Sequence, residues 1–186
     1  EMPVTTPPVE IEHATLGGGC FWCLEATFER LRGVSAVKNG YAGGQRPNPT
    51  YEQVCTGASG HAEVVQVTYD SAQISYRDLL EVFFTLHDPT QLNRQGPDVG
   101  TQYRSAIFPH TDAQAATARA LINELVETQV VSLPIVTTIE ENATFWPAES
   151  THDKYYKRHP FQPYCLAVIA PKLLKLRAKH ASKLKD

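Results

Sequence analysis

Two cysteines three residues apart follow a run of glycines near the start of the chain: Gly17-Gly18-Gly19-Cys20-Phe21-Trp22-Cys23. A cysteine at the first turn of a helix lies beside free backbone N–H groups and the positive end of the helix dipole, and both stabilise a thiolate. We therefore expect the pKa of Cys20 to be lowered and its thiolate to act as a nucleophile. The glycines leave room for other groups to approach the start of this helix closely.

The spacing of Cys20 and Cys23 has three interpretations: a redox pair, half of a zinc site, or coincidence. A structural zinc site usually adds a second pair of ligands at short spacing, and Cys55 and His61 are the nearest residues that could supply it. A phosphate-binding loop is disfavoured because no Gly-Lys-Ser/Thr follows the glycines. Redox chemistry is the interpretation we favour, and we expect no metal site.

Glu63 is the candidate acid. It lies in residues 61–69, whose alternation predicts a strand, and it shares a face with Val65, Val67 and Tyr69. Desolvation in such an apolar row would raise the pKa of the carboxyl and keep it protonated, as a proton donor must be. The strand pattern alone favours a different interpretation, in which Glu63 is an exposed glutamate at the end of the strand.

The elements that must position these residues alternate between the two periodicities. Strands are predicted over 11–16, 34–41, 61–69 and 102–108, and helices over 21–33 and 75–86. Beyond them, a helix begins after Thr111, a short strand covers 135–139, and a last helix begins near Pro171. The order β-α-β-β-α-β predicts an α+β fold, the split βαβ (ferredoxin-like plait) two-layer sandwich, with C-terminal extensions.

Two polar segments interrupt this order: residues 45–60, rich in Pro, Asn, Gly and Thr, and residues 91–100, which contain Gly. Both are predicted to be loops with little regular structure. Loops of such length in a compact domain usually carry function, so we expect them near the site.

The chain of 186 residues is short enough to be a single domain, 1–186. With 17 basic and 20 acidic residues it lacks the basic footprint of a nucleic-acid binder, and no run of about 18 apolar residues could span a membrane. Residues 1–10 are expected to be flexible, and residues 171–186, with six basic residues and one acidic, to form a basic helix. Four cysteines are too few for a disulfide scaffold, which favours the reducing cytoplasm, although a removed export signal would leave no trace. We expect the protein to be a monomer.

Six sequence blocks occur in the order in which peptide methionine sulfoxide reductases of the A type carry them. They are Gly19-Cys20-Phe21-Trp22, Gly40-Tyr41-Ala42-Gly43-Gly44, Asn48-Pro49-Thr50-Tyr51, Gly60-His61-Ala62-Glu63, Asn93-Arg94-Gln95-Gly96 and Gly100-Thr101-Gln102-Tyr103-Arg104-Ser105. From about Ala14 to Cys165 the chain resembles this family. The resemblance implies an enzyme that reduces the S epimer of methionine sulfoxide, free or in proteins, with electrons from thioredoxin and with no metal or organic cofactor.

The resemblance also implies roles for single residues. Cys20 attacks the sulfoxide sulfur and becomes a sulfenic acid, and Glu63 protonates the sulfoxide oxygen. Tyr51 and Tyr103 hydrogen-bond that oxygen. Phe21 and Trp22 form the apolar walls around the substrate methyl group. Asp98 is a carboxylate that helps to place substrate and water.

Resolution of the sulfenic acid is where the sequence departs from the family pattern. Tyr164-Cys165 matches the first resolving cysteine of the family's C-terminal tail, but no later cysteine follows, and Cys23 is an unusual addition after Cys-Phe-Trp. Two disulfides are possible, Cys20–Cys165 and Cys20–Cys23, and the motif slightly favours Cys165. A rigid and distant segment after Pro163 would favour Cys23. A general thiol–disulfide oxidoreductase and a zinc-stabilised binding module are the rival functions.

Overall fold

Six strands form the central sheet of the computed structural model, which describes residues 10–185. They are β1 (Ile11–Gly17), β2 (Val34–Ala42), β3 (Ala62–Asp70), β6 (Ala106–Phe108), β7 (Thr138–Ile139) and β8 (Trp146–Pro147). The strand order is β7-β6-β1-β3-β2-β8. All neighbours are antiparallel except β6 and β7, so the sheet is mixed, and with its packed helices the architecture is α+β, as predicted.

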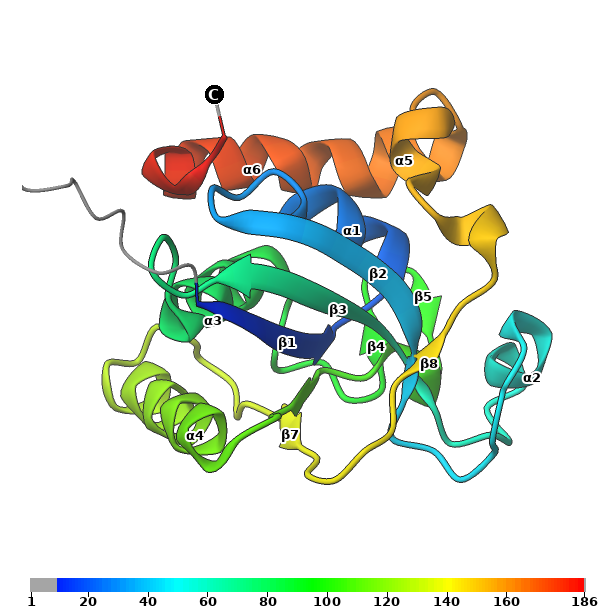
Figure 1. The fold of residues 1–186 in the computed structure, drawn as a ribbon, viewed down its shortest axis with the longest axis horizontal. Helices are drawn as coiled ribbons and strands as arrows, with labels where there is room; N and C mark the ends of the chain where they lie inside the picture. Colours follow the sequence, from blue (N-terminus) through cyan, green and yellow to red (C-terminus); the bar gives the residue numbers. More distant parts are fainter. Residues whose placement is uncertain (1–9, 186) are drawn as a thin grey trace, which may run out of the picture.

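The longer helices are α1 (Phe21–Phe28), α3 (Tyr76–Leu86), α4 (Asp112–Glu127) and α6 (Ala170–His180). In Figure 1, α1 and α3 lie behind the sheet, and α6 runs across the top of the molecule. α1 packs against β2 and β3 on one side and against α6 on another. Seven of its eight residues are therefore buried, which explains why its sequence is apolar nearly all round.

Side-chain caps begin the two helices that follow the pattern expected from the sequence. Ser75 Oγ accepts from the Asp78 N–H at 3.0 Å, while Asp78 accepts from the Ser75 N–H at 3.1 Å, and the two bonds form a capping box. Thr111 Oγ1 accepts from the Gln114 N–H at 3.1 Å at the start of α4. Each cap satisfies N–H groups that a helix end would otherwise leave unpaired.

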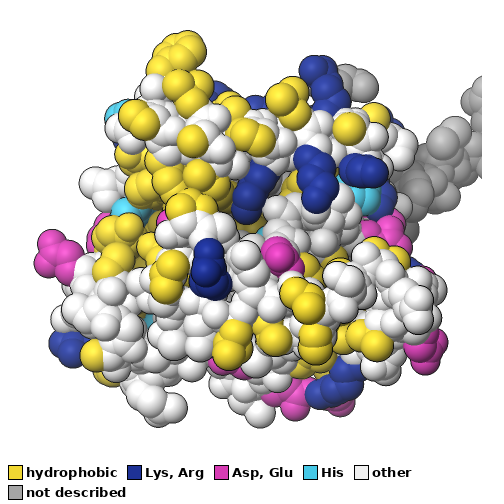
Figure 2. Space-filling view, turned by 180° about the vertical axis from the view of Figure 1, so that it is seen from behind, with side chains coloured by type: hydrophobic (Ala, Val, Ile, Leu, Met, Phe, Trp, Pro, Cys, Tyr) yellow, Lys and Arg dark blue, Asp and Glu magenta, His cyan; other side chains and the backbone are white. Residues whose placement is uncertain are grey.

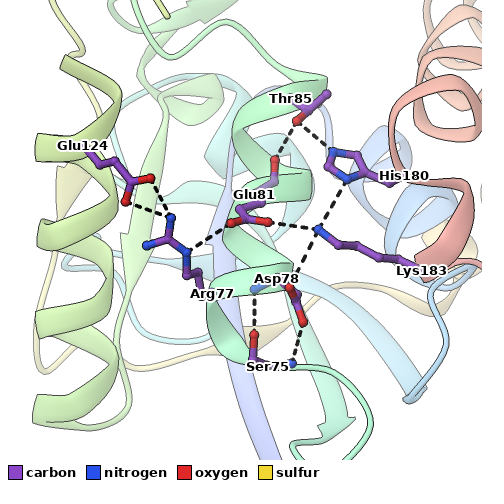
Figure 3. Close-up of polar contacts among 8 residues, drawn as sticks. All are labelled: Ser75, Arg77, Asp78, Glu81, Thr85, Glu124, His180 and Lys183. Atoms are coloured by element: carbon purple, nitrogen blue, oxygen red, sulfur yellow. Dashed lines mark hydrogen bonds and ion pairs between the residues drawn. The ribbon is translucent and has the colours of Figure 1, made fainter. Parts of the chain in front are cut away.

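Ion pairs and hydrogen bonds fasten the C-terminal segment to α3 (Figure 3). Lys183 Nζ lies 3.0 Å from Glu81 Oε2 and 3.8 Å from Asp78 Oδ1, and His180 Nε2 lies 2.9 Å from Thr85 Oγ1. On the other side of α3, Arg77 pairs with Glu81 and Glu124 and so joins α3 to α4. The basic helix is thereby held against the body of the protein.

Several predicted boundaries are wrong. The segment 45–60 contains a short helix, α2 (Tyr51–Cys55), because Thr50 and Gln53 form a capping box. The segment 91–100 contains a two-strand hairpin, β4 (Arg94–Gln95) and β5 (Asp98–Val99). Both were predicted as loops because short elements leave no periodic signal.

The predicted strand over 102–108 is shorter than expected, since Thr101–Tyr103 form a 3-10 helix and only Ala106–Phe108 pair with β1. The predicted strand over 135–139 shrinks to β7, and the first helix ends at Phe28, with a tight turn before Gly33 at φ +90°. The last helix is preceded directly by a π-helical turn, Cys165–Ile169.

The expected flexibility of residues 1–10 concerns positions that, apart from Glu10, lie outside the described residues. Glu10 itself is tied to the sheet, because its N–H donates to Asp70 Oδ1 at 3.1 Å. Within the described part of the chain, no helix has the length and apolar character needed to cross a membrane.

Candidate active site

Cys20 is the N-cap residue of α1 and lies at the end of the turn that follows β1. Gly19 adopts φ +89°, a conformation that glycine enters without strain, and its N–H donates to the Tyr103 carbonyl at 3.2 Å. A Cβ at Gly18 would lie 3.1 Å from the His87 ring, and one at Gly19 would lie 3.0 Å from Gln95. The space left by these glycines is thus filled by the protein itself.

Glu63 is fully buried on β3, with 0% of its surface exposed. Its Oε1 accepts a hydrogen bond from the backbone N–H of Phe21 at 3.2 Å, directly after Cys20, and its Oε2 has no hydrogen-bond partner among the described residues. Burial raises the pKa of the carboxyl to about 8, helped by the charge of Asp98 and opposed by the Phe21 N–H. The exposed alternative is therefore wrong, and Glu63 is mostly protonated at neutral pH.

The pKa values of the two thiols are shifted in opposite directions. Burial, a hydrogen bond to Cys23 and the charge of Glu63 raise the pKa of Cys20 well above its ordinary value. The hydrogen bond from Cys20 lowers the pKa of Cys23, with help from Lys172 and Tyr164, against the effect of burial. The prediction of a lowered pKa at Cys20 is wrong because burial of this helix start outweighs the stabilisation expected from its dipole.

Tyr164 connects the second thiol to the β4–β5 hairpin. Its hydroxyl donates to Asp98 Oδ2 at 2.6 Å and lies 3.7 Å from Cys23 Sγ. Cys165, the next residue, is also buried, and the one charge that raises its pKa besides burial is that of Cys23. Cys165 is the first residue of the π-helical turn before α6. The segment that carries it is an ordered helix start.

Aromatic rings surround the start of α1. The rings of Phe21 and Tyr51 stack with centroids 6.3 Å apart, and Trp22 stacks on Tyr155 at 3.7 Å with an interplanar angle of 7°. Trp22 is half-buried off the core face of α1, as predicted. Burial and then the charge of Glu63 raise the pKa of both Tyr51 and Tyr103, so both hydroxyls are protonated donors near neutral pH.

Three residues of this site were missed from the sequence: Glu149, His152 and Tyr164. Glu149 accepts from the Tyr41 hydroxyl and from the Tyr51 N–H, both at 3.1 Å. His152 Nδ1 accepts from Trp22 Nε1 at 3.1 Å. No periodic pattern marks this stretch of chain; the one available signal was the position of Tyr164 beside Cys165.

The residues considered for zinc are placed otherwise. His61 lies 2.6 Å from the Arg46 carbonyl through Nε2, and its Nδ1 accepts from the Gly44 N–H at 3.1 Å, which makes it a structural histidine. Cys55 is exposed and hydrogen-bonds to Tyr51 at the edge of the aromatic rings. Over residues 10–185, no group of three or more His, Cys, Asp or Glu side chains is arranged to hold a metal ion.

Comparisons with known proteins identify the family to which the chain belongs. The family model described as "Peptide methionine sulfoxide reductase" matches residues 12–185. A protein of Polynucleobacter asymbioticus named "Peptide methionine sulfoxide reductase MsrA" is 56% identical over 172 residues, covering 92% of this chain and 90% of its own.

Two solved structures are similar in fold. Reduced Mxr1 from Saccharomyces cerevisiae is 34% identical, with a TM-score of 0.75 over 88% of this chain and 93% of that chain. Mxr1 in complex with Trx2 is 26% identical, with a TM-score of 0.53 over 82% and 90%. This chain therefore belongs to the peptide methionine sulfoxide reductase family, in its A type, and is an oxidoreductase that acts on methionine sulfoxide.

Proposed function

We propose that the chain reduces the S epimer of methionine sulfoxide, free or in proteins, through a sulfenic acid on Cys20. The observation that carries the mechanism is the buried carboxyl of Glu63, which accepts from the N–H directly after Cys20 and has a pKa of about 8. A sulfoxide oxygen leaves only when it is protonated. A carboxyl that keeps its proton at neutral pH beside the nucleophile meets that need.

During the first step, the Cys20 thiol gives up its proton, and this proton replaces the one that Glu63 donates to the substrate. The Cys20 sulfur then forms a bond to the sulfoxide sulfur, and Glu63 gives its proton to the sulfoxide oxygen. The S–O oxygen transfers to Cys20 as methionine leaves. The products are methionine, the Cys20 sulfenic acid and Glu63 again in its acid form, with Cys23 unchanged as a thiol, so the sulfoxide is reduced by two electrons and Cys20 is oxidised by two.

Substrate placement follows from the groups around Cys20. Tyr51 and Tyr103 donate their hydroxyl protons to the sulfoxide oxygen, since the raised pKa of each keeps it protonated. Phe21 and Trp22 form the apolar wall for the methyl group. Asp98 helps to place substrate through the Tyr164 hydroxyl that it binds.

We propose Cys23 as the residue that resolves the sulfenic acid. It lies one helical turn from Cys20 on α1, and the Cys20 hydrogen bond lowers its pKa. Cys165 is fully buried in the π-helical turn that leads into α6, so it is not carried on a free tail. Attack of the Cys23 sulfur on the Cys20 sulfur forms the disulfide, and the sulfenic oxygen leaves as water with the Cys23 proton.

Thioredoxin is the proposed reductant, a role supported by the similarity to Mxr1, which was solved in complex with Trx2. A thioredoxin dithiol would attack the Cys20–Cys23 disulfide and return both thiols, becoming a disulfide itself. The cytoplasm, as a reducing compartment, would keep that dithiol available.

The finer fold assignment is also a proposal. We assign β1, α1, β2, β3, α3 and β6 to a split βαβ plait within one domain, a monomer with C-terminal extensions. The spatial order β6-β1-β3-β2 with every pair antiparallel supports it, because β3 then separates the parallel strands β1 and β2.

Incubation with racemic methionine sulfoxide and dithiothreitol tests the proposed reaction. We expect methionine to form until only the R epimer of the sulfoxide remains, as measured by chiral chromatography. Cys20→Ser should form no methionine, whereas Cys55→Ser should match the wild type. An unchanged epimer ratio in the wild-type reaction would overturn the proposal.

Release of methionine per enzyme molecule, without reductant and then with thioredoxin, tests the choice of resolving cysteine. Cys23→Ser should release one methionine per chain and then stop, because its sulfenic acid cannot form the disulfide. Cys165→Ser should turn over repeatedly with thioredoxin. The reverse result would assign resolution to Cys165.

A further inference from the structure

The Trp22 side chain is held by a residue 130 positions away in the chain. Its indole Nε1–H donates to His152 Nδ1 at 3.1 Å, and the backbone carbonyl of His152 accepts from the Asn39 side-chain amide at 2.9 Å. His152 is anchored to β2 by one bond and fixes Trp22 by the other. Both bonds belong to a residue that is 8% exposed.

The same imidazole packs against the other apolar walls. Its ring centroid lies 5.1 Å from that of Phe21, 4.6 Å from that of Tyr51 and 5.8 Å from that of Trp22. His152 is the last residue of a 3-10 turn that begins after Glu149, whose carboxylate accepts from the Tyr51 N–H at 3.1 Å. One short segment therefore contacts α1 and α2 at the three rings that border the substrate position.

The hydrogen bond requires a neutral imidazole, because only an unprotonated Nδ1 accepts from an indole N–H. Burial lowers the pKa of His152, and Arg158 lowers it further, while the nearby carboxylates Glu149 and Asp153 oppose the shift. The groups from α1 and α2 that face the imidazole, Phe21, Trp22 and Tyr51, are uncharged near neutral pH. The neutral, accepting form is thus the one present there.

We propose that His152 is a positioning residue that sets the affinity for substrate by fixing Trp22 in the methyl-binding wall. The inference rests on the proposed function. Trp22 would touch the methyl group rather than the reacting oxygen, so its orientation matters equally in the ground state and in the transition state. Loss of such uniform binding raises KM and leaves kcat unchanged.

Two variants separate the hydrogen bond from the ring. His152→Phe keeps an aromatic ring against Phe21 and Tyr51 but removes the acceptor, and KM should rise about tenfold with kcat within about twofold of the wild type. His152→Asn places an amide oxygen near the Nδ1 position, and KM should stay within about threefold of the wild type. The exposed His13→Phe, on β1, is the matched control and should change neither constant.

A third variant tests whether the effect runs through the indole. In a Trp22→Phe background, which lacks the donor, His152→Phe should raise KM no further. A fall in kcat at constant KM, an equal effect of the Asn and Phe substitutions at His152, or full additivity with Trp22→Phe would overturn the proposal.

Fluorescence tests the positioning without any substrate. The chain has two tryptophans, so Trp146→Phe leaves Trp22 as the single emitter. Acid should shift its emission to longer wavelength, with a midpoint below the ordinary histidine pKa of about 6.5, and His152→Asn should abolish that transition. A transition that survives in His152→Asn would overturn the proposal. Failure of the wild type to reduce sulfoxide would instead count against the proposed function alone.

Discussion

The active site and the ion-pair cluster of Figure 3 both contain ionisable side chains on neighbouring elements, but the two groups differ in their exposure to solvent. In the cluster, Arg77 is 41% exposed and Glu124 is 51% exposed across a contact of 2.8 Å. At the active site, Glu63 is 0% exposed and burial moves its pKa to about 8. Exposure to solvent therefore affects the strength of an electrostatic interaction more than the number of charges does.

Figure 2 shows the side of the molecule opposite to that of Figure 1, where charged and hydrophobic side chains are distributed differently. Lys and Arg side chains project separately from it, and hydrophobic side chains gather in the region of α5 and the start of α6. Phe161, between these two elements, is 83% exposed, and Leu166 is 52% exposed. The charges visible there are solvated, whereas the groups assigned to chemistry lie beneath the surface.

The largest expected effect is that of Glu63→Gln. It keeps the shape of the side chain but removes the proton that the sulfoxide oxygen needs, so kcat should fall by a factor of about 10²–10⁴. Glu25→Gln is the matched control, since Glu25 is also buried and burial raises its pKa, yet its carboxyl hydrogen-bonds to Lys154 and Asn39. It should leave kcat at the wild-type level. Equal losses in both variants would mean that burial alone, rather than position beside Cys20, matters.

The pH dependence of the first turnover should follow Glu63. As a proton donor it must be protonated, and with a pKa of about 8 it is so below that pH. The rate of methionine release should therefore fall about tenfold for each pH unit well above 8. Rapid-quench measurement of one turnover without reductant gives this profile. The residual activity of Glu63→Gln should lack the alkaline limb, and its persistence there would assign the limb to another group.

The smallest effect is expected in the surface cluster. Lys183→Met removes the contacts with Glu81 and Asp78, which are 35% and 39% exposed, and should lower the free energy of unfolding by about 0.2–1 kcal/mol. Urea denaturation measures it, and high salt should shrink the difference. The exposed Lys179→Met should cost nothing. A loss of several kcal/mol in Lys183→Met would show that the cluster behaves like a buried ion pair.

The order of the main elements could be predicted because apolar periodicity is a local property. β1, β2, β3, α1 and α3 occur where alternation or the 3.6-residue repeat placed them, and the caps at Ser75 and Thr111 were legible in the sequence. α2 and the β4–β5 hairpin were missed, because elements of two to five residues contain too few positions to show a period.

The candidate site was predictable only in part. The pattern on β3 alone did not favour burial of Glu63, although the face that it shares with Val65 and Val67 followed from the sequence. The contacts of Glu149 and His152 did not, since a hydrogen bond between residues more than 90 positions apart leaves no local trace. Tyr164 was passed over for the same reason, although its neighbour Cys165 was noticed.

The sequence by itself determined which thiols and carboxyls are candidates for chemistry, and that the thiol of Cys20 stands next to a helix start. Only the tertiary structure decided how those groups ionise. α1 is enclosed by the sheet and by α6, and this enclosure raises the pKa of Cys20 and leaves Cys23 with the lower one. A pKa depends on every group that excludes water from the site, and those groups come from segments that the chain brings together only on folding.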